Sequence, residues 1–284
     1  MTAEPQRPFP SGLRGIARKI LPSWLRRLFR RLFGWRWFRG YYLTWTEAAA
    51  HAQSYSSPGI LEKVLVATLA VQTGRAAYER DAVLFAEPCP EGELLAALLR
   101  VASAHDGQLN LLDFGGSLGT SYWQHRAFLP ALKSLRWDVV EQEHFVEAGR
   151  THVEQPAEPL RFFLTIEEAE QSHRHNVLLA SGVIHCLPEP YVFLEKLIAS
   201  GPEYLIFHNL PLHDDRPDHL RVEHVPPEIY EATYPVWFFN RQKFLGQLTA
   251  GYDVVHTYAS SAVWPIGWSE YPSTGLLLRR KGTK

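Results

Sequence analysis

The feature that most constrains the fold is the stretch from Leu109 to Gly119, which reads Leu-Asn-Leu-Leu-Asp-Phe-Gly-Gly-Ser-Leu-Gly. A short apolar run that ends in an acid and passes at once into glycines is typical of a buried parallel strand turning into a helix. Gly115 permits a sharp bend, and Asp113 would lie at the carboxyl end of the strand, where ligands of open α/β sheets bind. An ordinary corner between a strand and a helix has the same pattern.

A carboxylate downstream favours a ligand site over an ordinary corner. Residues 136–140 have the pattern of a second strand, and Glu141 follows it 22 positions after Gly119. This offset is close to the ~20 residues at which an acid meets the ribose hydroxyls of a nucleotide-type cofactor. The glycine turn and Glu141 together predict a cofactor site.

Strands and helices continue to alternate, which predicts a doubly wound, mostly parallel, Rossmann-like sheet of seven strands. The five further strands are expected at 160–164, 176–181, 204–207, 252–255 and 274–278. Helices are expected at 91–104, at 190–199 and from a cap at Asn240 to Gly251, whereas residues 40–85 read as helices and turns. We therefore divide the chain into a basic arm (1–39), a helical cap (40–104) and a Rossmann-like domain (105–284) with a lid insertion at about 208–239.

Charge is distributed unevenly along the 284 residues. Residues 1–40 hold ten of the 29 Lys and Arg and one of the 30 Asp and Glu, which leaves an acidic remainder. An acidic body argues against nucleic acid as a partner. The chain has only two cysteines, which is typical of a reducing compartment, and no apolar run approaches the ~20 residues that span a bilayer. These features predict a cytoplasmic protein.

The arm itself has the pattern of an amphipathic helix. Leu25, Leu28, Phe29, Leu32 and Phe33 recur at helical spacing, with arginines on the opposite face and tryptophans at both ends. Residues 13–39 carry basic and no acidic side chains, which favours peripheral binding to an anionic membrane surface. The alternative is a helix that docks on its own domain or on a partner protein.

With these elements in place, the sequence resembles the class I S-adenosylmethionine-dependent methyltransferases. The segment Asp113-Phe114-Gly115-Gly116-Ser117-Leu118-Gly119 matches their first motif except at Ser117, which replaces a glycine. More narrowly, the chain resembles a bacterial group of methyltransferases associated with surface-polysaccharide gene clusters. The pieces shared with that group include residues 78–85, 112–122, 137–142, 188–191 and 226–237.

The resemblance implies a cofactor, S-adenosylmethionine, and a set of residues that would bind it. Glu141 would hold the ribose, and the segment after the fourth strand, from Ser181 to Tyr191, would lie beside the transferable methyl group. If the position of Ser117 requires a positive φ, serine there costs roughly 1 kcal/mol or more. The residues expected to bind the cofactor are Asp113, Gly115, Gly116, Ser117, Gly119, Glu141, Gln142 and Ser181.

A hydroxyl acceptor needs a general base, and imidazole is the usual group near neutral pH. His185, in the segment after the fourth strand, and His208, at the end of the fifth, are the candidates; both could instead be wall residues. Tyr230, Tyr234 and Trp237 are expected to form an aromatic lid over the acceptor, or to pack the lid on the sheet.

For two further groups of charged residues we favour a structural role over a functional one. The ligand-type side chains of the loop 213–219 could hold a divalent metal, but charged loop residues are usually solvated, so no metal site is predicted. Arg80 and Asp81 are expected to form a structural ion pair.

Two functions of different classes follow. The first is a methyltransferase that acts on a hydroxyl of a surface glycan, of a lipid-linked precursor or of a small molecule. The second is a catalytically silent relative that acts in membrane-associated assembly, favoured by Ser117 alone. An NAD-dependent oxidoreductase fits less well, because the glycine spacing differs from Gly-x-Gly-x-x-Gly.

Overall fold

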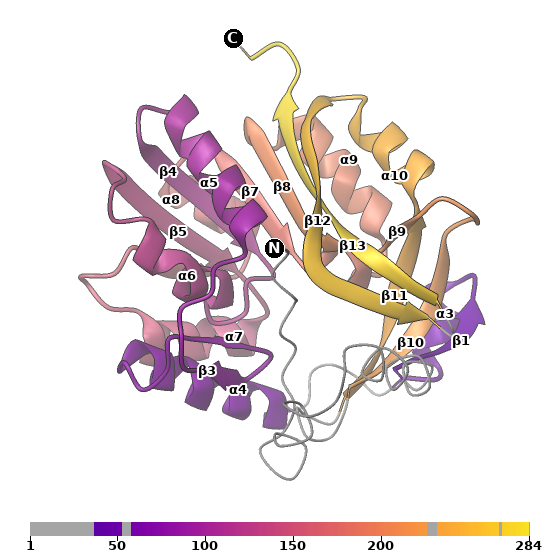
Figure 1. The fold of residues 1–284 in the computed structure, drawn as a ribbon, viewed down its shortest axis with the longest axis horizontal. Helices are drawn as coiled ribbons and strands as arrows, with labels where there is room; N and C mark the ends of the chain where they lie inside the picture. The colour runs from indigo at the N-terminus through magenta and orange to yellow at the C-terminus, as the bar shows by residue number, and fades with distance from the viewer. Residues whose placement is uncertain (1–36, 53–57, 226–231, 267–268, 284) are drawn as a thin grey trace, which may run out of the picture.

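A seven-stranded sheet forms the centre of the computed structural model, which describes residues 37–52, 58–225, 232–266 and 269–283 (Figure 1). The strands lie in the order β6-β5-β4-β7-β8-β13-β12; β4 to β8 run parallel, and the β12–β13 hairpin closes the sheet antiparallel. The predicted fold class is therefore confirmed. The strands are β4 (Gln108–Phe114), β5 (Ser134–Val140), β6 (Leu160–Phe163), β7 (Val177–Ser181), β8 (Tyr204–Leu210), β12 (Tyr252–Ile266) and β13 (Ser269–Arg280).

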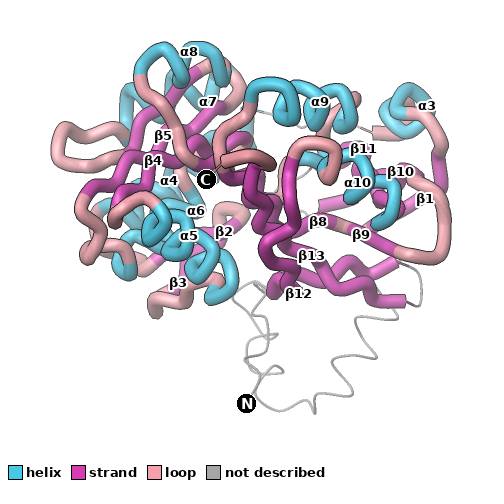
Figure 2. The backbone as a smooth tube through the Cα atoms, turned by 90° about the horizontal axis from the view of Figure 1, so that it is seen from above, coloured by secondary structure: helices cyan, strands magenta, loops and turns pink. Residues whose placement is uncertain are grey.

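Helices cover both faces of this sheet (Figure 2). Successive side chains of a strand point to opposite faces, so Leu111 of β4 packs in one buried cluster and Leu112 in the other. One face is covered by α4 (Pro58–Gln72), α5 (Gly92–Ala104), α6 (Thr120–His125) and α7 (Glu143–Ala148). The other is covered by α8 (Ile166–Ser172), α9 (Pro190–Ser200) and α10 (Arg241–Leu248). The predicted helices at 91–104, 190–199 and after Asn240 correspond to α5, α9 and α10.

The lid insertion contains strands that the sequence analysis did not predict. β9 (Leu212–His213), β10 (His219–Val225) and β11 (Ala232–Asn240) form a second sheet with β1 (Phe38–Tyr42), in the order β1-β10-β11-β9. β1 lies almost 180 residues before β10, so no local pattern reveals this pairing. α3 (Trp45–Ala49) packs on one face of the sheet through Ala48, beside Leu220 and Val222.

The long β12–β13 hairpin joins the two sheets. Trp264 of β12 packs against Phe38 of β1 and Phe238 of β11, with ring centroids 5.7 and 5.8 Å apart. Phe38 is only 3% exposed. A domain boundary at residue 39 would therefore cut through β1 beside the buried Phe38, so residues 37–39 belong to the folded body.

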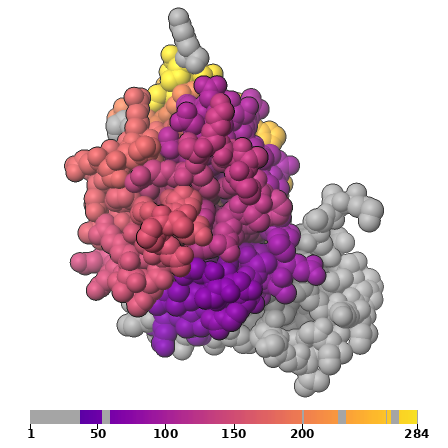
Figure 3. Space-filling model, turned by 90° about the vertical axis from the view of Figure 1, so that its left-hand side faces the viewer, coloured from indigo at the N-terminus to yellow at the C-terminus, as the bar shows by residue number. Residues whose placement is uncertain are grey.

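The segment 40–104 is not wholly helical, which corrects a second expectation. β2 (Tyr78–Arg80) and β3 (Val83–Phe85) form a hairpin whose two-residue turn, Asp81-Ala82, has φ angles of 51° and 61°. The hairpin packs on α4 and α6. Figure 3 shows the face on which α4 and the hairpin, in violet, form a band beside the magenta surface of later residues.

Most of the basic arm, residues 1–36, and Tyr230 lie outside the described residues. Within the part of the chain that the structure describes, no helix is both long enough and apolar enough to cross a membrane.

Candidate functional site

The glycine turn after β4 has the strained backbone that its sequence suggested. Gly115, Ser117 and Gly119 all have positive φ angles, of 70°, 55° and 85°. Serine in this region costs roughly 1–2 kcal/mol relative to a normal conformation. The turn therefore keeps a non-glycine residue where glycine would be unstrained.

Asp113 supports this turn from beneath rather than facing a ligand. The residue is fully buried, and its Oδ2 accepts a hydrogen bond of 2.9 Å from Trp137 Nε1. A Cβ atom on Gly116 would lie 2.5 Å from the Asp113 carboxyl carbon, so only glycine lets the turn cross the carboxylate. Burial raises the pKa of Asp113 to about 7, opposed by the Trp137 hydrogen bond.

Glu141 lies next to the turn, as the offset of 22 residues predicted. One carboxylate oxygen accepts the backbone N–H of Gln142 at 2.6 Å, and the backbone N–H of Ser117 also hydrogen-bonds to this side chain. Burial raises the pKa of Glu141 above its ordinary value. The carboxylate is thus oriented by two backbone donors beside the glycine turn.

A cavity of about 960 Å³ opens at the carboxyl ends of β4, β5, β7 and β8. The chain winds one way from β4 to β6 and the other way through β7 and β8, so this is the switch point at which α/β sheets bind ligands. Eight predicted site residues line the cavity: Gly115, Gly116, Ser117, Glu141, Gln142, Ser181, His208 and Tyr234.

His208 lines this cavity, and one of its ring nitrogens has no partner among the described residues. The residue is 2% exposed; its Nδ1 lies 3.1 Å from the Tyr258 hydroxyl, whereas its buried Nε2 has no hydrogen-bond partner among the described residues. Burial lowers the pKa of His208 to about 4, so the ring is neutral near pH 7. The neighbouring Asn209 also lines the cavity and has a φ of 60°.

Four predicted site residues do not line the cavity. Asp113 and Gly119 lie behind the turn. His185 is 4% exposed and packs edge-on against Trp264, and burial lowers its pKa to about 3. The Trp237 indole donates to the Leu187 carbonyl and stacks on Phe239, so it packs the lid. Of the predicted lid residues, Tyr234 alone is described at the cavity.

The sequence analysis missed a charged part of the cavity wall. Glu79, Arg80 and Asp81 of the β2–β3 hairpin line the cavity, together with Glu91. Arg80 pairs with Glu91 at 2.5 Å, and not with Asp81 as predicted, and it also donates to Gln124 at 3.1 Å. The only signal in the sequence was that residues 78–85 were among the segments on which the narrower resemblance rested.

The loop 213–219 uses its charged side chains locally. Asp214 pairs with Arg241 at 2.9 Å and Asp215 with Arg216 at 3.2 Å, while His213 and His219 are buried. Among the residues that the structure describes, no group of three or more His, Cys, Asp or Glu side chains could hold a metal ion.

Comparison with known proteins gives likeness at the level of the fold. No family profile and no curated protein matches the chain. Similar solved structures include the N-terminal domain of EvdMO1 with SAH bound, at 15% identity over 78% of this chain and 97% of that chain, with a TM-score of 0.39. The CcbJ methyltransferase from Streptomyces caelestis has 13% identity, coverage of 74% and 96%, and a TM-score of 0.44.

A third is the glycopeptide N-methyltransferase MtfA complexed with S-adenosylmethionine, at 13% identity over 60% of this chain and 86% of that chain, with a TM-score of 0.40. The ligands named with these structures include the cofactor that the sequence resemblance implied. At such identities and TM-scores the functional argument rests on this chain's own strand order and cavity.

Proposed function

We propose that this protein is an S-adenosylmethionine-dependent methyltransferase that methylates a hydroxyl group of a surface glycan or of a lipid-linked precursor. One observation carries the proposal: a single cavity at the switch point joins the glycine turn, Glu141 and His208, whose Nε2 has no hydrogen-bond partner among the described residues. A cofactor and an acceptor need to share one such space, because methyl transfer requires their reacting atoms in contact.

The residues on the β4–β5 side fit a nucleoside cofactor. Glu141, already oriented by two backbone donors, would accept hydrogen bonds from the ribose hydroxyls. Gln142 and Leu164 line the cavity beyond it and would contact the base. The glycine turn would bring its backbone close to the amino-acid end. When bound, the cofactor supplies a methyl group activated by a positively charged sulfur.

His208 is the residue that we assign to the proton. In the tautomer in which Nδ1 donates to the Tyr258 hydroxyl, Nε2 carries an unused lone pair. The acceptor hydroxyl becomes strongly acidic only as its oxygen bonds to the methyl carbon. A neutral imidazole with a lowered pKa can then take the proton, and needs no prior deprotonation at neutral pH.

The lid side of the cavity supports a polar, ring-shaped acceptor. Trp45 and Tyr234 provide aromatic surface, while Asn209 and Glu91 provide hydrogen-bonding groups at the other wall. Faces of sugar rings pack on aromatic side chains, and their hydroxyls bond to planar polar groups. The link to surface glycans comes from the sequence resemblance, and the cavity lining supports it.

A catalytically silent relative is the second candidate, and the positive φ of Ser117 is the observation that favours it. Such a protein would bind the cofactor weakly or not at all. Calorimetry with S-adenosylmethionine, S-adenosylhomocysteine and NAD on the full chain separates the candidates. We expect S-adenosylmethionine and S-adenosylhomocysteine to bind and NAD not to bind. If neither of the two sulfur compounds binds, the proposal is overturned.

Glu141→Ala tests the ribose assignment. Hydrogen bonds to a charged group contribute roughly 1.5–3 kcal/mol, so S-adenosylhomocysteine should bind about 10- to 100-fold more weakly. Glu143→Ala removes a neighbouring exposed carboxylate and is the matched control. Equal affinity of wild type and Glu141→Ala would remove Glu141 from the site.

A further inference from the structure

Glu79 is a buried carboxylate that the proposed reaction does not use. It is 1% exposed, yet it lines the cavity from the β2–β3 hairpin. Buried acids usually have a cationic partner, because an unpaired charge away from water is costly. Glu79 forms no ion pair with any described residue, since the neighbouring guanidinium of Arg80 is bound to Glu91 and Gln124.

The contacts of Glu79 come from neutral donors on two elements. Oε1 accepts the hydroxyl of Thr120, the first residue of α6, and Oε2 accepts the backbone N–H of Ala82 at 3.1 Å. Thr120 directly follows Gly119, so one carboxylate ties the hairpin turn to the end of the glycine turn. The carboxylate is therefore oriented at the cofactor end of the cavity, with lone pairs left to accept a further donor.

The charge of the lining shows which donor is missing. Among the described lining residues, four are acids (Glu79, Asp81, Glu91 and Glu141), and Arg80 is the one Lys or Arg. Such a wall repels a phosphate and attracts a cation. Among the titratable groups that act on Glu79, Asp81 disfavours the ionised form and Arg80 favours it, while α6 contributes only the Thr120 hydroxyl.

We infer that Glu79 is the counter-charge for an aliphatic ammonium group bound in the cavity. An ammonium has three donors and no acceptor, which suits a carboxylate held by neutral groups. Two sources have this chemistry: the α-ammonium of the cofactor's amino-acid end, and an amino group on the acceptor. The inference rests on the proposed function and adds a residue and a ligand group to it.

Proton release measures this contact without catalysis. Burial raises the pKa of Glu79 to about 7, so about half of the ligand-free molecules carry a proton there at pH 7. An ammonium bound at the carboxylate would lower this pKa and expel the proton. Calorimetry of the full chain in buffers of different ionisation enthalpy counts the protons released per ligand bound.

Two probes distinguish the ammonium from the rest of the ligand. S-adenosylhomocysteine carries the α-ammonium, whereas 5′-methylthioadenosine has the same adenosine and thioether but no amino-acid end. We expect the first to release up to about half a proton more than the second at pH 7. Glu79→Gln should abolish this difference and weaken S-adenosylhomocysteine about 10- to 100-fold, with methylthioadenosine unchanged. Glu87→Gln, an equal charge change at an exposed position that does not line the cavity, should preserve the difference.

Amine probes test the second source. If Glu79→Gln leaves S-adenosylhomocysteine binding unchanged, the binding of glucosamine and of glucose is compared on the protein loaded with S-adenosylhomocysteine. If the wild type prefers glucosamine and the variant does not, the ammonium group belongs to the acceptor. Equal proton release from both nucleosides, with no glucosamine preference, overturns the inference while the proposed function stands. Failure of S-adenosylhomocysteine to bind the wild type overturns both. The wild-type measurements need no variant, so misfolding of Glu79→Gln does not obscure the result.

Discussion

At the scale of single residues, the glycine turn shows two opposite requirements at adjacent positions. Gly116 crosses the Asp113 carboxylate so closely that no side chain fits, whereas Ser117 occupies a left-handed conformation that glycine would adopt without strain. At position 116 the contact with Asp113 excludes any side chain. At position 117 a side chain fits, but the backbone conformation is strained.

We therefore expect Gly116→Ala and Ser117→Gly to have opposite effects on S-adenosylhomocysteine binding. The alanine methyl would displace Asp113 or the turn, so binding should fall by at least about 10-fold, which corresponds to about 1.4 kcal/mol. Ser117→Gly should bind equally well or better, because it relieves strain. Calorimetry on both variants tests this; collapse of binding in Ser117→Gly would show that the hydroxyl contacts the ligand.

The titration of Asp113 predicts how stability depends on pH. The folded-state pKa of about 7 is above the ordinary value of 3.8, so the native protein binds more protons than the unfolded chain between these values. Stability from this group is fully present below pH 4 and is lost as pH rises to about 7. Asp113→Asn keeps an acceptor for Trp137 and removes the titration.

The free energy of unfolding of Asp113→Asn should therefore improve relative to wild type between pH 5 and pH 8. Urea denaturation of both proteins at several pH values measures this difference. A difference that is constant with pH would mean that Asp113 does not titrate in this range.

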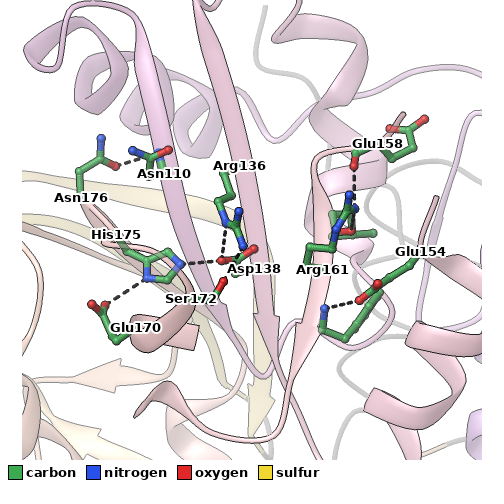
Figure 4. Close-up of polar contacts among 12 residues, drawn as sticks. Asn110, Arg136, Asp138, Glu154, Glu158, Arg161, Glu170, Ser172, His175 and Asn176 are labelled. Atoms are coloured by element: carbon green, nitrogen blue, oxygen red, sulfur yellow. Dashed lines mark hydrogen bonds and ion pairs between the residues drawn. The ribbon is translucent and has the colours of Figure 1, made fainter. Parts of the chain in front are cut away.

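At the scale of elements, an ion cluster built on the buried Asp138 and His175 connects β5 with α8 and with the residues just before β7 (Figure 4). Asp138 of β5 accepts Arg136 at 2.8 Å and His175 Nε2 at 2.9 Å, and His175 Nδ1 lies 3.1 Å from Glu170 of α8. Both ring nitrogens face carboxylate oxygens, which only accept.

His175→Ala removes one buried hydrogen-bond partner of Asp138, while the ion pair of Asp138 with Arg136 remains. The free energy of unfolding should therefore fall by about 1–3 kcal/mol, measured by urea denaturation. Affinity for S-adenosylhomocysteine, measured on the folded fraction, should not change, because the cluster does not line the cavity. Arg174→Ala, at the exposed neighbouring position, should alter neither quantity; an equal loss there would show that the loop, and not the ion cluster, is responsible.

Local patterns sufficed for most of the central sheet and for half of the site. β4, β5 and the glycine turn were predictable because strand, turn and acid follow each other within about 30 residues. The second sheet was not, because β1 and β10 are paired across almost the whole body. Glu79 was missed for the same reason: only folding brings its hairpin to α6.

At the scale of the whole molecule, the arm and the body meet at β1. We expect the full chain to float with anionic liposomes, because residues 13–36 combine basic side chains with an apolar stripe. The binding should weaken between 0.1 and 1 M salt, as the Debye length falls from ~10 to ~3 Å. Neutral liposomes and a chain lacking residues 1–36 are the controls. Equal flotation of both chains would show that the arm does not bind membranes.

The point of truncation affects the stability of the body. Removing residues 1–39 also removes Phe38, which packs on Phe238 and Trp264, and deleting a buried phenylalanine costs about 3–5 kcal/mol. Thermal denaturation should therefore show a lower Tm for the chain lacking 1–39 than for the chain lacking 1–36. Equal Tm values would mean that β1 contributes nothing to the body.

The closing hairpin also determines when the cavity can form during synthesis. β8 carries His208, but its outer edge pairs with β13, which ends at Arg280, and Tyr258 comes from β12. Residues up to Leu276 must therefore have left the ribosome before the end of β8 has both its neighbours. The glycine turn and the strands around it, β4, β5 and β7, all precede β8 in the chain, so we expect the cofactor half of the cavity to form before the half that we assign to the acceptor.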